Sequence, residues 1–314
     1  MKNLLSCLLC FFSMARLAAE PAFDYGLQAQ RVADEVYVFI GRDEDFSTVN
    51  GGNIVNTGFI VTVAGLVVID SGPSLRYGQQ MQRAMRKVSW VAPLQVFNTH
   101  HHPDHFLGNQ AFAGTPIVAL EATRQGIAAE GNVFAENLYR LSGDWMKGTE
   151  SMTPTASIAP GRHTIAGRTL RLLALNGHTE SDLAIYDETS GVLFAGDLVF
   201  NNRAPTTPHA RIERWLASLD TLEAITRESG FSAIVPGHGA IARDAAPIRQ
   251  TRAWLSWLDQ AMRQAAADGL DLNEVLARPL PAEFAGMAVG VREYRRSVGH
   301  LFPAAEQEAL GHAH

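Results

Sequence analysis

Cysteine is almost absent from this chain of 314 residues, which has only Cys7 and Cys10. Both lie in the segment "LLSCLLCFF", which follows Lys2 and precedes small residues, a pattern typical of a secretory signal peptide. We expect residues 1–19 to be cleaved off and the protein to be periplasmic or secreted; the alternatives are a lipoprotein site at Cys7 and a buried N-terminal helix. Cleavage leaves no cysteine, which excludes disulfides and thiolate metal ligands from the mature chain.

Basic residues are also scarce, with 26 lysines and arginines against 32 aspartates and glutamates. Loss of Lys2 and Arg16 with the signal peptide leaves 24 basic residues against 32 acidic residues, a net charge of −8. A chain with this excess of negative charge is an unlikely partner for nucleic acid, so we expect none. No hydrophobic run after the signal is long enough to cross a bilayer, and we therefore expect no stable membrane anchor.

Two rounds of strands, hairpin and helix follow the signal peptide. In the first, "EVYVFIG" alternates as a strand, a hairpin turns at Ala64-Gly65 and ends at Asp70, "SLRYGQQMQRAMRKV" is helical, and "PLQVFNT" is a buried strand. In the second, "TLRLLAL", "DLAIYD" and "GVLFAGD" precede a helix that we expect Gly230 to end, and "FSAIV" follows. This repetition predicts two β-sheets packed face to face with helices outside them.

The C-terminal part of the sequence, residues 244–314, has a helical pattern in place of the alternation of strands. Asp244 is a plausible N-cap, Pro247 suits a first helical turn, and an apolar stripe runs from Trp254 to Met262. We expect a helical extension that packs on the core and has no chemistry of its own.

The stretch "FNTHHHPDHFLGN" places four histidines and an aspartate within six positions directly after a strand. Side chains at i and i+2 of an extended chain share a face, so His100 and His102 can bind one ion together. His101 must then point elsewhere, and we expect a structural role for it. Asp104 and His105 begin a short helix and offer a carboxylate and an imidazole to a second position.

Three more residues, His178 in "NGHT", Asp197 in "FAGD" and His238 in "VPGHG", are each preceded by glycine and are each expected in a loop after an apolar strand. Glycine lets the backbone approach a site closely. The donors from these four segments are the nitrogen and oxygen ligands that suit zinc, iron or manganese. Two such ions can share a water and lower its pKa toward neutrality, and Asp104 would orient the resulting hydroxide.

These motifs, in this order, resemble the metallo-β-lactamase-fold hydrolase superfamily. The resemblance implies a four-layer αβ/βα sandwich over residues 30–243. It also implies a first metal on His100, His102 and His178, a second on Asp104, His105 and His238, and Asp197 as the bridging ligand. Asp70, at the end of "VVID", matches an acid that supports such a site. Two zinc ions are expected, with iron or manganese as alternatives.

Within the superfamily, "VYVFIGRDEDFSTVNGGNIVNTGFIVT" and "NTHHHPDHFLGNQAF" look most like the quinoprotein relay system zinc metallohydrolases. This resemblance implies a secreted hydrolase whose metal-bridging hydroxide attacks a small thioester, ester or amide, linked to a periplasmic quinoprotein dehydrogenase. A class B3-like β-lactamase, against which Asp197 counts, and a non-catalytic metal-bearing accessory protein are the alternatives. Glyoxalase II and the persulfide dioxygenases share these ligand types as well.

Two further features leave their roles open. His209, in "NNRAPTTPHA", either lines the substrate mouth or lies in a surface loop, and the loop is favoured. Residues 121–150 either form a lid with Phe134, Tyr139 and Trp145 facing substrate or place these aromatic residues in the core, which is favoured.

Overall fold

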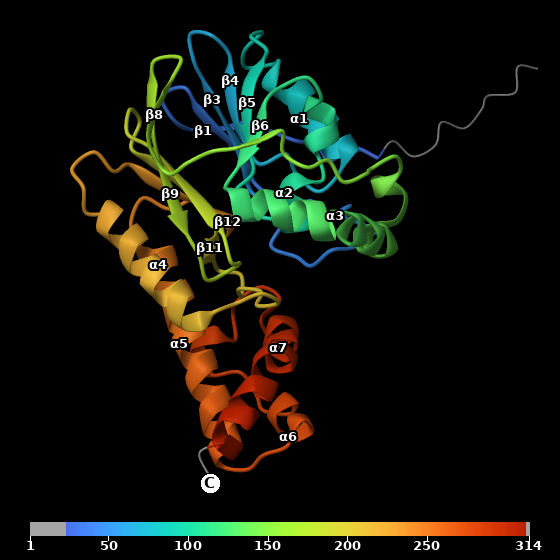
Figure 1. The fold of residues 1–314 in the computed structure, drawn as a ribbon, viewed down its shortest axis with the longest axis vertical. Helices are drawn as coiled ribbons and strands as arrows, with labels where there is room; N and C mark the ends of the chain where they lie inside the picture. Colours follow the sequence, from blue (N-terminus) through green and yellow to red (C-terminus); the bar gives the residue numbers. More distant parts are fainter. Residues whose placement is uncertain (1–22, 312–314) are drawn as a thin grey trace, which may run out of the picture.

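Two β-sheets face each other in the computed structural model, which describes residues 23–311 (Figure 1). The predicted signal peptide lies outside the described residues. The first sheet has the order β1-β2-β3-β4-β5-β6-β7 and the second the order β12-β11-β10-β9-β8. The strands of the first sheet are β1 Gln30–Ala33, β2 Val36–Phe39, β3 Thr57–Val61, β4 Leu66–Ile69, β5 Pro93–Phe97, β6 Ile117–Ala119 and β7 Ala156–Ser157. Those of the second are β8 Gly161–Ile165, β9 Arg168–Leu175, β10 Asp182–Asp187, β11 Val192–Asn201 and β12 Ala233–Gly239.

The apolar alternation of the strands decides which side chains lie between the two sheets. Val36 and Val38 of β2 pack against β9 and β10 of the second sheet, while Phe39 belongs to the cluster on the outer face of the first. The predicted hairpin is confirmed, because β3 and β4 pair antiparallel with Gly58 opposite Ile69. β4 and β5 then run parallel, so the chain leaves both strands at the same edge, next to Asp70 and His100.

Helices cover the outer faces of both sheets, so the predicted four-layer sandwich is confirmed. α1 (Leu75–Met85) packs on the first sheet, and α4 (Ile212–Ile225) and α5 (Ala246–Ala267) pack on the second. Four shorter or peripheral elements border the edge where the histidines lie: α2 Pro103–Phe106, η1 Asn109–Phe112, α3 Glu121–Ser142 and η2 Gly143–Met146.

Two helix boundaries differ from the sequence predictions. α4 ends at Ile225, well before Gly230, which instead packs against the turn at Gly191, where a Cβ would come within 1.8 Å of the Gly230 carbonyl oxygen. Ala245, not Asp244, is the N-cap of α5, although the Asp244 carboxylate accepts the Ala246 N–H at 2.6 Å. The apolar stripe of α5 is buried as predicted.

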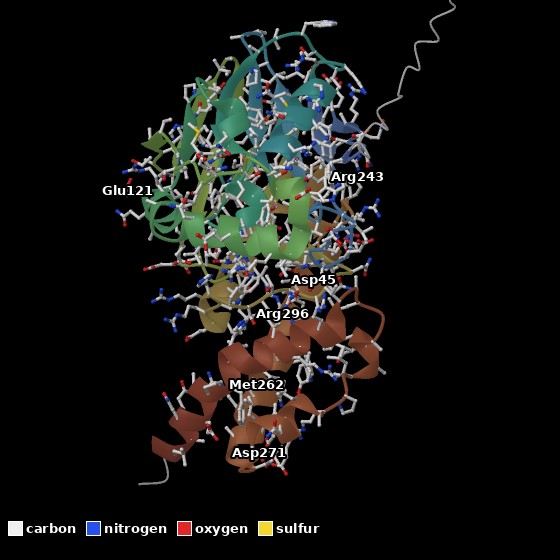
Figure 2. The ribbon with its side chains drawn as sticks, turned by 90° about the vertical axis from the view of Figure 1, so that its right-hand side faces the viewer. Asp45, Glu121, Arg243, Met262, Asp271 and Arg296 are labelled. Atoms are coloured by element: carbon white, nitrogen blue, oxygen red, sulfur yellow. The ribbon has the colours of Figure 1, made fainter. Side chains whose placement is uncertain are left out.

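The C-terminal helices form a unit beside the sandwich, made of α5, α6 (Leu272–Leu276), η3 (Ala282–Phe284) and α7 (Gly290–Gly311) (Figure 1). Asp45, from the segment between β2 and β3, binds Arg296 of α7 at 2.6 Å, and the two residues lie at the junction in Figure 2. Arg203 extends this junction, because its guanidinium donates to the Glu44 carbonyl at 3.3 Å and lies 3.9 Å from Glu293. The helical unit therefore holds the segment around Asp45 in place. Within residues 23–311, none of the helices has both the length and the apolar character needed to cross a membrane.

Replacing Asp45 with asparagine is expected to lower the free energy of unfolding by about 1–2 kcal/mol at pH 7, because the buried Asp45 carboxylate loses its ion pairs with Arg296 and Arg292. Burial alone would raise the pKa of Asp45, but the charge and hydrogen bonds of Arg296, the Phe46 N–H and the charge of Arg292 outweigh it and lower the pKa. This stabilisation is therefore complete above about pH 4, the unfolded pKa, and is lost as pH falls through the lower folded pKa.

Urea denaturation of the Asp45→Asn protein at pH 7 measures this effect, and Asp34→Asn is the matched control. Asp34 also pairs with an arginine, Arg31, but the side chains of that pair are 83% and 60% exposed, so its loss is expected to change the free energy of unfolding by less than about 0.5 kcal/mol. Equal effects of the two substitutions would show that Asp45 does not fasten the segment to α7.

Candidate metal centre

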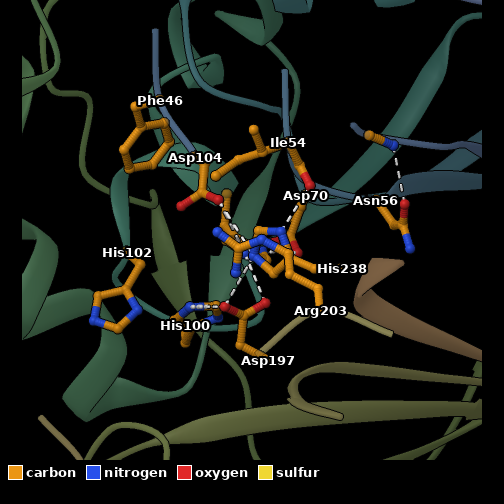
Figure 3. A network of polar contacts seen from close by, with 12 residues as sticks. Phe46, Ile54, Asn56, Asp70, His100, His102, Asp104, Asp197, Arg203 and His238 are labelled. Carbon is orange, nitrogen blue, oxygen red and sulfur yellow. Dashed lines mark hydrogen bonds and ion pairs between the residues drawn. The ribbon is translucent and has the colours of Figure 1, made fainter. Parts of the chain in front are cut away.

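The predicted metal ligands meet at one edge of the sandwich, between the two sheets (Figure 3). They form two groups of buried side chains. In the first, one ligand atom from each residue lies within 4.8 Å of the others, and its members are His100, His102, His178 and Asp197. The second is equally close and consists of Asp104, His105 and His238. The structure thus brings together all seven side chains in the two predicted sets, although metal binding by each residue stays a prediction.

Asp197 lies between the two groups. Its Oδ1 is 3.1 Å from Nε2 of His105, in the second group. Its Oδ2 is 3.2 Å from Nε2 of His238, in the second group, and 3.4 Å from Nε2 of His178, in the first. One carboxylate that faces both groups is the arrangement expected of a bridging ligand.

The donor atoms themselves fit a divalent cation. Nε2 of His100, Nε2 of His105 and Oδ1 of Asp197 are buried and make no hydrogen bond of acceptable geometry. A buried polar atom without a partner is costly, so such atoms in a native structure point to a missing partner. Imidazole nitrogens and carboxylate oxygens around a shared position supply the ligand set of zinc and related metals.

Asp70, which directly follows β4, contacts the candidate site, and its supporting role stays a prediction. Its carboxylate accepts the Thr99 N–H and hydroxyl, each at 2.8 Å, and lies 2.8 Å from Nδ1 of His105. The Thr99 hydroxyl oxygen lies 3.1 Å from Nδ1 of His100. When Nδ1 carries the proton in both histidines, Nε2 of each is free to face the metal position.

The ring orientations of His238, His102 and His178 are fixed by other contacts. His238 places Nδ1 at 2.6 Å from the Ile54 carbonyl oxygen, so its Nε2 also faces inward. His102 is reversed: its Nδ1 lies 2.8 Å from Nε2 of His178, and its Nε2 points out of the group. The ring of His178 packs edge-on against Trp215 of α4, with ring centroids 4.9 Å apart.

Glycine before a ligand has a steric purpose here, as the sequence suggested. A Cβ at Gly237, next to His238, would lie 1.9 Å from Oδ1 of Asp197. The expected loop positions of Asp197 and His238 are wrong, however, because these residues lie inside β11 and β12. The parallel pairing of the two strands becomes irregular around Gly196 and resumes at Phe200 opposite His238, so the strands continue past the site.

Electrostatics sets the three histidines of the first group apart from His105. Burial lowers the pKa of His100 and His102 well below the ordinary value and that of His178 to about 3, outweighing the opposing charge of Asp197. Burial also opposes the charged form of His105, but Asp197, Asp70 and Asp104 outweigh it and raise its pKa. Histidines that stay neutral are ready to bind a metal without first losing a proton.

His209 contacts the centre although the sequence favoured a surface loop. Its Nδ1 lies 2.9 Å from Nε2 of His102, a contact between residues 107 positions apart, which the interpretation as a surface loop missed. Its side chain is about a third exposed (35%). His101 lies outside the two groups, as expected, and its ring centroid is 5.0 Å from that of His209.

The three aromatic residues Phe134, Tyr139 and Trp145 lie in different environments. Phe134 of α3 lies beside the centre, with its ring centroid 6.3 Å from that of His102. Tyr139 is 48% exposed. Trp145 packs on Tyr25 with ring centroids 4.5 Å apart and donates its indole N–H to the Thr48 carbonyl oxygen at 2.9 Å. Of these three, Phe134 is the residue whose ring contacts histidines of the centre, within the part of the chain that the structure describes.

A family model described as "Metallo-beta-lactamase superfamily" matches residues 50–258, which include both groups. The chain belongs to the metallo-β-lactamase superfamily. A solved structure of a metallo-β-lactamase from Pontibacter korlensis superposes with a TM-score of 0.59 at 20% identity, over 73% of this chain and 99% of that one. At that identity the likeness shows the shared fold alone.

Curated relatives within the metallo-β-lactamase superfamily have different activities. A linear primary-alkylsulfatase from Pseudomonas sp. is 24% identical over 79% of this chain and 54% of the relative. A hydroxyacylglutathione hydrolase from Synechococcus sp. is 29% identical over 41% of this chain and 44% of the relative. The chain thus spans about half the length of the curated relatives it matches. These superfamily members are metal-dependent hydrolases, which agrees with a buried His/Asp cluster able to bind a divalent metal.

Proposed function

We propose that this protein is an exported dinuclear zinc hydrolase that cleaves a small thioester, ester or amide in the periplasm. One observation supports this proposal above the others: the Asp197 carboxylate lies between two buried groups of metal-competent side chains, and Nε2 of His100 and Nε2 of His105 face it without a hydrogen bond. A structural zinc site holds one closed ion, whereas here one carboxylate is shared between two neighbouring positions, as in dinuclear hydrolytic sites.

Zinc would supply Lewis acidity there, lowering the pKa of a shared water and polarising the scissile carbonyl. The residues of the chain then position the reactants. Oδ2 of Asp104 is 3.5 Å from Nε2 of His238 and 3.9 Å from Nε2 of His105, toward the second position. Its other oxygen, Oδ1, accepts a proton from the attacking water and holds that water in line with the carbonyl. Phe134 offers an apolar surface for the acyl part of the substrate.

The names of the relatives point to small-molecule hydrolysis without agreeing on one bond. One relative is named for a hydroxyacylglutathione and the other for a linear primary alkyl sulfate. We propose that the substrate is a small molecule and that the enzyme acts together with a periplasmic quinoprotein dehydrogenase, because of the sequence resemblance. A class B3-like β-lactamase and a non-catalytic metal-bearing accessory protein are the competing functions, and the hydrolysis panel distinguishes them.

The proposal is tested by metal analysis of periplasmically produced protein together with a hydrolysis panel of a thioester, an ester, an amide, a lactone, a β-lactam and a linear alkyl sulfate. We expect about two equivalents of zinc and hydrolysis of at least one carbonyl substrate that a chelator abolishes and added zinc restores. Hydrolysis of the β-lactam alone would establish the lactamase alternative. Metal without hydrolysis, together with a co-purifying partner, would establish the accessory role.

A further inference from the structure

Four of the five metal-facing histidines have a partner for the outward nitrogen, while Nδ1 of His178 is buried without a hydrogen bond. One of the four partners is a residue outside the seven. Nδ1 of His105 faces Asp70, Nδ1 of His238 faces the Ile54 carbonyl oxygen, and Nδ1 of His100 faces the Thr99 hydroxyl oxygen. In His102 the outward atom is Nε2, and its partner is Nδ1 of His209 at 2.9 Å. His209 thus occupies for His102 the place that a carboxylate, a carbonyl or a hydroxyl occupies for the other three.

The chemistry of imidazole assigns the proton in this contact. A neutral imidazole has one lone pair, so a His102 that presents the lone pair of Nδ1 toward His178 and the metal position must carry its proton on Nε2. That N–H donates to Nδ1 of His209. The proton of His209 is then on Nε2, which lies 3.8 Å from the Glu130 carboxylate of α3. The outward hydrogen bond of a metal-binding histidine fixes its tautomer and its ring orientation.

We propose that His209 is a positioning residue, which holds His102 in the Nδ1-binding tautomer and thereby sets the affinity of the first metal position. Glu130 of α3 lies near the other nitrogen of His209 at 3.8 Å, which is beyond hydrogen-bond distance, so the support of His102 comes from the loop before α4. This inference rests on the metal centre of the proposed function and needs no hydrolytic activity.

A third metal ion at this place is the competing interpretation. His101, His102 and His209 also bring one ligand atom each within 4.8 Å of one another. Once His102 uses the lone pair of Nδ1 in the first group, however, its Nε2 carries a proton and has no lone pair to give. Only the imidazoles of His101 and His209 then remain to bind an ion, and His209 is partly exposed. Two such ligands make a poor metal site, so a hydrogen bond between His209 and His102 is the better interpretation.

The test compares His209→Leu, which removes the acceptor, with His209→Asn, which keeps a side-chain oxygen acceptor. His163→Leu is the control, because His163 is a histidine outside all three groups whose Nε2 contacts the Ala159 carbonyl oxygen. Zinc affinity is measured by competition with a chromophoric chelator. Histidine side-chain ¹⁵N NMR of the zinc-loaded proteins reports which nitrogen of His102 carries the proton.

We expect His209→Leu to weaken zinc binding at one position by about 10- to 100-fold, the usual cost of losing such a support. His209→Asn should recover part of the loss, the control should equal the unmodified protein, and Nε2 of His102 should carry the proton. Unchanged zinc affinity in His209→Leu, or a proton on Nδ1 of His102, would overturn the proposal. A third zinc equivalent that His209→Leu removes would overturn it too, since His209 would then be a ligand. Failure of the unmodified protein to bind zinc would instead refute the metal centre itself.

Discussion

Replacing Asp104 with asparagine is expected to reduce kcat by about 10³-fold while the protein keeps its fold and at least one bound metal, because proton transfer by a positioned group typically contributes 10²- to 10⁴-fold. Asparagine matches aspartate in size but cannot accept the proton of the attacking water. His105, His238 and Asp197 still surround the second position. Steady-state kinetics with the substrate identified in the panel measures the loss.

Asp268→Asn is the control for this substitution, because Asp268 is an exposed acid that follows α5 in the C-terminal unit. It should leave kcat and metal content unchanged. A pure loss of metal in the Asp104→Asn protein, with activity restored by excess zinc, would mean that Asp104 acts only as a ligand. Full activity at ordinary zinc concentration would remove Asp104 from the mechanism.

Local sequence patterns predicted most of the fold because each pattern reflects a contact made nearby. The hairpin turning at Ala64-Gly65 and the stripe from Trp254 to Met262 depend on strand alternation and helical periodicity, which the chain carries in a few consecutive residues. The end of α4 was misjudged because Gly230 serves a long-range contact: it packs against Gly191 and not at a helix terminus. A glycine in the sequence can mark the end of a helix or a close contact with a distant segment, and the local sequence does not distinguish the two.

For the candidate site, too, the local features could be predicted from the sequence and the long-range contacts could not. His100 and His102 could be paired from their spacing along an extended segment. The resemblance to a known family supplied the grouping of His178 with them and of His238 with Asp104 and His105. The role of His209 could not be found this way, since its contact with His102 depends on how the loop before α4 folds back toward the segment after β5. The loop setting predicted for Asp197 failed because pairing with β12 continues beyond the ligand, which only the tertiary structure shows.

Replacing Asp197 with asparagine is expected to abolish the two-metal state, with at most one zinc equivalent retained after dialysis. The affinity for zinc should fall by at least about 100-fold, which exceeds the usual cost of losing a supporting contact. The reason is geometric: one carboxylate faces His105 of the second group through Oδ1, and through Oδ2 it faces both His238 of the second group and His178 of the first. Asparagine has one oxygen and no charge, so it cannot balance two cations. Metal analysis and chelator competition measure the change.

The choice of asparagine keeps the test separate from folding. Gly237 leaves room for the Asp197 carboxylate, at 1.9 Å from where a Cβ would lie, so a side chain of equal size fits the same space. The metal-free Asp197→Asn protein should therefore keep its fold, with a melting temperature that reports the loss of the buried His105–Asp197 pair. Added zinc should raise the melting temperature of the unmodified protein by more than that of the variant, by the free energy of the extra binding. Asp220→Asn, at a side chain 72% exposed, is the control and should behave as the unmodified protein. Two tightly held equivalents in the Asp197→Asn protein would contradict a bridging role, because each group would then suffice alone.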